Sequence, residues 1–201
     1  MISANEILGI LFLSFFSANS VLIRSAGLDS AERLSREPHR VPIFAAVITV
    51  SSIISNAMAE AVLIYIIPIF GITPSTLLDG TVIVLCVIAA AAAGEQLVKR
   101  RIPDLPEKMP EGEIFTVGCN SAVAGIVLLC RAATTEFDKS IIYCAVISAS
   151  VVLVYYAISL WRLDLRQHKL ADAFRGAPIL FIMLGLAAMV LEGYGGITLP
   201  V

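Results

Sequence analysis

Charged residues are scarce in this chain of 201 residues: only 15% are charged, whereas 58% are hydrophobic. A soluble domain averages about 25% charged and about 45–50% apolar residues. The sequence also lacks a basic tract, an acidic tail and any loop long enough to fold as a separate soluble domain. These absences argue against a nucleic-acid-binding protein and against a soluble enzyme, and they favour an integral membrane protein.

Motifs for catalysis are missing as well. The two histidines form no cluster, no nucleophile stands beside a base, and no glycine-rich phosphate or dinucleotide loop occurs. The four cysteines form no CxxC pair and fall inside apolar runs, so we interpret them as buried small side chains. No Lys or Arg precedes Arg24, so the first apolar run is expected to be a retained helix rather than a cleaved signal peptide.

Long apolar runs dominate what is present. A membrane-spanning helix needs about 20 mostly apolar residues, and six runs approach or exceed that length. The second is long enough to tilt, whereas the fourth is short for a full span, which is typical of a broken or partly re-entrant segment. The sequence therefore predicts an all-α integral membrane protein with six transmembrane helices, at residues 6–23, 41–70, 77–98, 114–129, 140–160 and 179–193.

Basic residues predict the orientation of these helices. Of the 14 Lys and Arg residues, 12 lie after the first, third and fifth runs, and only Arg131 and Lys139 lie between the fourth and the fifth. Cytoplasmic loops carry such an excess of positive charge. Both termini are therefore expected on the outer side of the membrane.

Two polar positions interrupt apolar runs at matching places. Asn19 and Ser20 lie in the first run, and Asn120 and Ser121 lie in the fourth. An Asn at membrane depth is costly unless its amide is hydrogen-bonded, and small neighbours allow a helix to break there. Such marks in two halves indicate an inverted repeat with a site between broken helices. We predict a single membrane domain with a 3+3 inverted repeat and broken helices one and four, with bounds 1–201 and halves 1–102 and 111–201.

Acidic side chains at membrane depth mark ion paths or pairing positions. Glu60 is the deepest of them, and Glu95 precedes Lys99 by four residues, a spacing that also favours an exposed ion pair. Asp79 and Glu192 lie near predicted helix ends and are expected to be solvated. The ion-path or helix-break candidates are thus Asn19, Ser20, Glu60, Glu95, Asn120 and Ser121.

Several short motifs together resemble one family of membrane proteins. Residues 19–24 (NSVLIR), followed by Gly27-Leu28, resemble the first-helix motif of the A subunit of the Rnf electron transport complex. The same motif occurs in the related E subunit of the Na⁺-translocating NADH:quinone reductase. Asn120 with residues 122–125 (AVAG) resembles the fourth-helix motif, and residues 173–179 (AFRGAPI) resemble the loop that opens the sixth helix. The motifs occur in the same order and at the same spacing as in the family, and together they extend the resemblance over nearly the whole chain.

The resemblance implies a subunit in the cytoplasmic (inner) membrane of a bacterium or archaeon. Its partners would be a homologous six-helix subunit of opposite orientation, other subunits of an electron transport complex and the lipid bilayer. In this family the two homologous subunits hold a binuclear iron-sulfur cluster between them, each giving two Cys thiolates. Here Asp29 and Ser121 stand where the family has Cys, and Cys119 would need a shift of register to replace the second ligand.

The departure at both ligand positions implies a divergent, non-catalytic subunit that acts as scaffold and ion path and binds no cofactor alone. A cluster shared with the partner is the alternative. Two other functions stay open on the sequence. One is a stand-alone secondary transporter or channel with a midplane site at the breaks of helices one and four. The other is a structural membrane partner without a path of its own.

Overall fold

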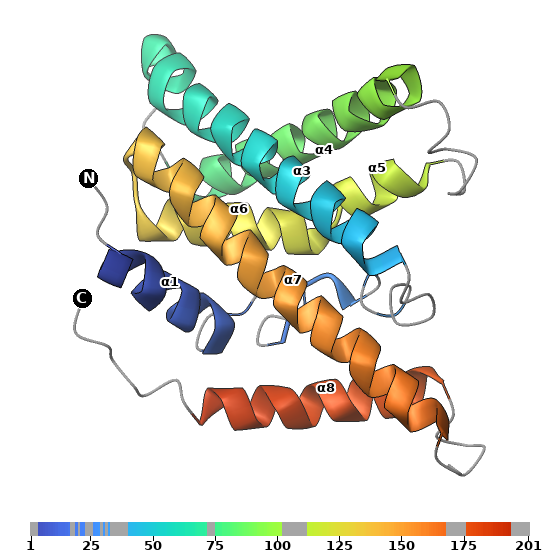
Figure 1. Ribbon diagram of the computed structural model, residues 1–201. Helices are drawn as coiled ribbons and strands as arrows, with labels where there is room; N and C mark the ends of the chain where they lie inside the picture. The colour runs from blue at the N-terminus through green and yellow to red at the C-terminus, as the bar shows by residue number, and fades with distance from the viewer. Residues whose placement is uncertain are drawn as a thin grey trace. The chain divides into compact units, whose positions relative to one another are not determined.

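Every regular element that the structure describes is a helix. The computed structural model describes residues 4–16, 19, 21–22, 26–28, 30, 32, 40–71, 75–101, 112–167 and 176–193. Within these ranges no β-strand occurs, which confirms the all-α prediction for this part of the chain (Figure 1).

Four helical segments are long and apolar enough to cross a membrane. They coincide with the second to fifth predicted runs, and they are Val41–Phe70, Leu77–Arg100, Glu113–Ala133 and Phe137–Leu165. Helix α8 (Ala177–Glu192) is apolar but shorter, with 16 residues. These segments make the chain a multi-pass helical membrane protein.

The first predicted run is not one continuous helix. Helix α1 (Ala4–Phe16) ends seven positions before the predicted end at residue 23. The Asn19 side chain explains the ending, because its Oδ1 accepts hydrogen bonds from the backbone N–H groups of Val21 at 3.0 Å and Leu22 at 3.2 Å. A side chain that satisfies these donors locally competes with helical hydrogen bonding.

Residues 46–148 form one compact unit, here called the central unit. Helix α3 (Val41–Ala61) continues into a π-helical turn, η2 (Val62–Ile66), and a 3₁₀ turn, η3 (Ile67–Phe70). Gly71 ends this segment with a φ of 66°, a left-handed conformation that glycine adopts at little cost. Helix α4 (Thr76–Arg101) packs against α5 (Glu113–Gly118) and α6 (Ser121–Ala133), which follow one another along it (Figure 1).

Small side chains bring α3, α4 and α5 close together. A Cβ atom added at Gly118 of α5 would lie 2.9 Å from Oγ of Ser51 on α3 and 3.2 Å from Cβ of Ala91 on α4. Ala91 is buried, as is its neighbour Ala90. Small residues at helix contacts let backbones approach closely in membrane proteins. The backbone of α5 therefore touches both neighbours where it ends.

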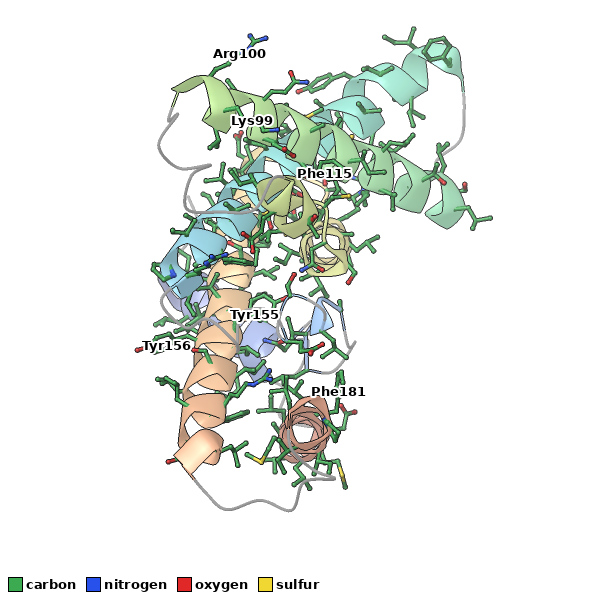
Figure 2. All side chains as sticks on the ribbon, turned by 90° about the vertical axis from the view of Figure 1, so that its right-hand side faces the viewer. Lys99, Arg100, Phe115, Tyr155, Tyr156 and Phe181 are labelled. Atoms are coloured by element: carbon green, nitrogen blue, oxygen red, sulfur yellow. The ribbon has the colours of Figure 1, made fainter. Side chains whose placement is uncertain are left out.

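Residues 1–45 and 149–201 form a second compact unit, here called the terminal unit. Much of helix α7 (Phe137–Gln167) belongs to it. The buried Tyr155 donates a hydrogen bond from its hydroxyl to the carbonyl oxygen of Gly27 at 3.0 Å, and Nη1 of Arg162 donates to the carbonyl oxygen of Glu32 at 3.4 Å. Figure 2 shows Tyr155 and the exposed Tyr156 on different sides of α7. These contacts hold the backbone at Gly27 and Glu32 against α7.

Candidate charged site in the membrane helices

Four helices of the central unit place a polar side chain in one cluster. Glu60 is the second-last residue of α3, and Asp79 lies in the first turn of α4. Arg131 lies in the last turn of α6, and Ser140 lies near the start of α7. The helical segment of α3 continues past Glu60 to Phe70, whereas α6 ends and α4 and α7 begin near the cluster. With Asn56, which lies one turn before Glu60 on α3, they form what we call the Glu60 cluster.

Hydrogen bonds and ion pairs connect the whole cluster. Nη1 of Arg131 lies 2.9 Å from Oε2 of Glu60, and Nε of Arg131 lies 3.7 Å from Oδ2 of Asp79. Oγ of Ser140 donates to Oε1 of Glu60 at 3.4 Å and accepts a hydrogen bond from Nδ2 of Asn56 at 2.8 Å. One guanidinium group therefore bridges two carboxylates, and a hydroxyl links the second oxygen of Glu60 to an amide.

The cluster is largely shielded from the surface of the chain. The exposed fraction of the side chain is 2% for Glu60, 18% for Arg131 and 23% for Asp79. Charged groups that are removed from water need an opposite charge and hydrogen bonds to offset their desolvation. The Arg131 guanidinium supplies both for Glu60. The sequence singled out Glu60 among the acids, and the structure identifies Arg131 as the group that compensates its charge.

Sequence reasoning missed three contributors to the cluster. Arg131 is expected in a loop but lies in α6, and Asp79 is expected to be solvated although its Oδ1 is buried. The prediction for Asp79 is thus wrong in part, because α6 covers the first turn of α4 with Arg131. Glu192 is exposed, as predicted. Nothing in the sequence around Ser140 indicated its role. Arg131 could have been noticed, because it follows an apolar run directly, on the predicted side of the membrane with few basic residues.

Glu95 is not part of this cluster. Its Oε1 lies 2.8 Å from Nζ of Lys99, whose side chain is 51% exposed, so the predicted ion pair one turn apart is confirmed. Figure 2 shows Lys99 near the C-terminal end of α4. With a rise of about 1.5 Å per residue, the 16 positions between Asp79 and Glu95 correspond to about 24 Å along the helix. The two acids therefore lie toward opposite ends of α4.

The two asparagines of the predicted helix breaks both stabilise local backbone turns. Asn120 separates α5 from α6 and is the N-cap of α6, where its Oδ1 accepts from the backbone N–H of Ala122 at 3.2 Å and from Oγ of Ser121 at 3.3 Å. Asn19 is buried and accepts two backbone hydrogen bonds after α1. Asn19 belongs to the terminal unit and Asn120 to the central unit. Ser20 lies outside the described residues.

Replacing Asn120 by Ala is expected to lower the free energy of unfolding by about 0.5–2 kcal/mol, the usual cost of losing an N-cap side chain. The reason is that the backbone N–H of Ala122, which is buried, loses its acceptor. Thermal or denaturant unfolding in detergent measures the change. Asn120→Ser is the matched control, because Ser also caps helices well; an equal loss in both variants would contradict a capping role.

Ser121 is the one described residue that stands where the resembled family has a Cys ligand. Ser121 is exposed and offers a hydroxyl, which donates to Asn120, where a thiolate is needed. Cys119 lies between α5 and α6, and its backbone N–H is bonded to the carbonyl of Phe115. Asp29 lies outside the described residues. Among the residues that the structure describes, no three His, Cys, Asp or Glu side chains are grouped to hold a metal ion.

The fold and the charged site define a multi-pass helical membrane protein with a buried ion pair among its apolar helices. The chain is similar to the A subunit of the ion-translocating oxidoreductase complex of Azoarcus sp. (strain BH72), with 31% identity over 117 residues. The match takes in 57% of this chain and spans 59% of the length of that protein. It confirms the resemblance indicated by the motifs. No protein-family model matches the chain.

Proposed function

We propose that this chain is a membrane subunit of an ion-translocating electron transport complex of the Rnf and Nqr type. The similarity to the A subunit of an ion-translocating oxidoreductase complex is the observation that carries this proposal. Four apolar spans and short polar connections support it, because they leave the chain little surface for chemistry outside the bilayer. In this role the chain is scaffold and ion path, and other subunits carry the electrons.

The proposed architecture is a single membrane domain of six helices with both termini outside. In it, α1 and α8 are the first and sixth helices of a 3+3 inverted repeat with halves 1–102 and 111–201. The equivalent use of Asn19 and Asn120 supports this repeat, since each caps a backbone turn beside an apolar helix. The proposed location is the cytoplasmic membrane of a bacterium or archaeon.

The proposed partner is a homologous six-helix subunit of opposite orientation, within a larger complex. We further propose that this chain contributes no iron-sulfur ligand, on the ground that Ser121 supplies a hydroxyl in place of a thiolate. The Glu60 cluster is the part of the proposed ion path that the geometry supports best, because it combines carboxylates, a hydroxyl and an amide inside the central unit. Glu95 is proposed as a second, separate position on that path.

One observation favours the alternative of a stand-alone transporter. Nδ2 of Asn19 is buried and has no hydrogen-bond partner among the described residues. A buried donor without an acceptor is costly, and a solute that supplies the acceptor would remove the cost. In this alternative the break after α1 is part of a solute site.

Purification of the tagged chain from its native membrane in a mild detergent tests the proposal. We expect flavin-containing or iron-sulfur subunits and a homologous membrane subunit to co-purify in fixed ratio. An unrelated tagged membrane protein of similar size, purified in parallel, is the control for carry-over. A clean homo-oligomer without redox subunits would contradict the proposal and favour the transporter.

Iron content and visible spectra of the same preparation test the absence of a ligand from this chain. We expect any iron-sulfur spectrum to be unchanged by Cys119→Ala. A spectrum that disappears in this variant would show that the chain holds a cluster through Cys119.

A further inference from the structure

We propose that the Glu60 cluster binds one monovalent cation, either a proton or an alkali metal ion such as Na⁺. The inference deepens the proposed function and rests on it for the use of the cation in transport. The binding itself depends only on groups within the central unit. Three observations carry it: the charge of the cluster, two acceptor atoms without donors, and the chemistry of the ligands.

The cluster has one negative charge more than its cation compensates. Glu60 and Asp79 are carboxylates, and Arg131 is the one cation that contacts them in the described part of the chain. Lys139, the next cation along α7, forms its own ion pair with Glu136 at 2.9 Å. Ionised carboxylates and one guanidinium thus leave a net charge of about −1 among apolar helices, where unpaired charge is costly.

The other side chains that face Glu60 do not supply the missing charge. Cys130 of α6 and Cys144 of α7 are both buried within the central unit. A cysteine side chain carries no positive charge in either protonation state, so neither thiol can compensate the carboxylates. From α7 the cluster receives the neutral hydroxyl of Ser140, and from α3 the neutral amide of Asn56.

Two buried oxygen atoms have no donor among the described residues: Oδ1 of Asn56 and Oδ1 of Asp79. Asn56 is fully buried, and its amide reaches the cluster because Nδ2 donates to the same Ser140 hydroxyl that donates to Glu60. A buried acceptor without a partner costs about 1–3 kcal/mol, and more when it is charged. A bound cation would supply the missing charge and a partner for such acceptors together.

The ligand types agree with a hard monovalent cation. Carboxylate, amide carbonyl and hydroxyl oxygens are the groups that hard cations prefer, whereas soft metals select thiolates. A proton is the other cation that this chemistry accommodates, because a protonated carboxyl group donates a hydrogen bond. Arg131 stays in place in both cases and limits the uptake to a single positive charge. The cluster is therefore distinct from a site for a divalent ion.

Thermal unfolding of the purified protein, with any subunits that co-purify, measures the binding. The salt is changed from choline chloride to NaCl, LiCl or KCl at constant ionic strength, between pH 5 and pH 8. For a bound alkali metal ion we expect a saturable rise of Tm, by about 5–10 °C when the ion reaches about 100 times its Kd. For a bound proton we expect Tm to rise as the pH falls, without a difference among the salts.

Two variants test whether the Glu60 cluster is responsible. Asp79→Asn and Glu60→Gln each remove the excess negative charge, so either variant is expected to lose the dependence of Tm on the cation. Glu136→Gln is the matched control, because Glu136 is an exposed acid outside the cluster, and it is expected to keep that dependence. The use of two variants keeps the test decisive if one of them does not fold.

A Tm that responds neither to alkali metal ions nor to pH would overturn the inference, as would a response that persists in both Asp79→Asn and Glu60→Gln. Neither result would affect the co-purification of redox subunits, which tests the proposed function. Conversely, a homo-oligomer with a cation-dependent Tm would overturn the proposed function and keep the binding site.

Discussion

Replacement of Arg131 by Ala is expected to destabilise the protein by about 3–5 kcal/mol, the cost of removing one partner of a buried ion pair. The variant leaves Glu60, with a side chain that is 2% exposed, and Asp79 without their shared cation. Chemical or thermal unfolding in detergent, with far-ultraviolet circular dichroism as the probe, measures the loss. The remaining excess charge should also make the stability of the variant more sensitive to added Na⁺ or to low pH.

Lys139→Ala is the matched control for Arg131→Ala. Lys139 also pairs with a carboxylate at 2.9 Å, but both side chains are exposed, with 41% for Lys139 and 65% for Glu136. Exposed pairs contribute about 0–1 kcal/mol. Equal losses of stability in Arg131→Ala and Lys139→Ala would contradict the prediction, because they would show that the burial of the Arg131 ion pair adds nothing to its contribution. Adding Glu60→Gln to Arg131→Ala should recover part of the loss, because it removes one of the uncompensated charges.

Replacement of Gly118 by Val is the second change with a large expected effect. Its Cβ would lie 2.9 Å from Oγ of Ser51 and 3.2 Å from Cβ of Ala91, before the two methyl groups are placed. Overpacking of this kind costs about 1–3 kcal/mol, and sometimes more. We expect a lower Tm, measured by thermal unfolding in detergent, because α5 must move away from α3 and α4.

Two variants determine whether the close approach of the helices causes this effect. Gly94→Val is the matched control, because a Cβ at Gly94 of α4 meets nothing within 4 Å, and this variant should be close to neutral. Ser51→Ala removes the nearest atom, Oγ, and should restore part of the stability of Gly118→Val. A similar fall of Tm in Gly94→Val and Gly118→Val would show that valine lowers the stability of a helix at either position, without any role for the close contact at Gly118.

Arg131 and Asp79, the two charged partners in the cluster, explain why the sequence described the surroundings of Glu60 only in part. A lone acid in an apolar run predicts a partner but does not identify it, because the partner can come from any other helix. Arg131 is 71 positions away from Glu60 and Ser140 is 80 positions away. The sequence placed Asp79 in solvent because it did not reveal that the packing of α6 against α4 brings Arg131 next to it.

The sequence by itself determined the features that depend on neighbouring residues. The second to fifth spans follow from apolar runs of membrane length, because hydropathy adds up along a segment. The cap at Asn120 and the ion pair of Glu95 with Lys99 join residues at most four positions apart. Such contacts form within one turn of helix and therefore leave a local pattern in the sequence.

The tertiary structure alone decided which distant groups meet. It brings Arg131 between two carboxylates, places Gly118 against α3 and α4, and joins Tyr155 to Gly27 across 128 positions. Helix packing depends on the shapes of whole helix faces, so these contacts have no short motif. For the same physical reason, the excess charge of the Glu60 cluster becomes visible only when α3, α4, α6 and α7 are brought together.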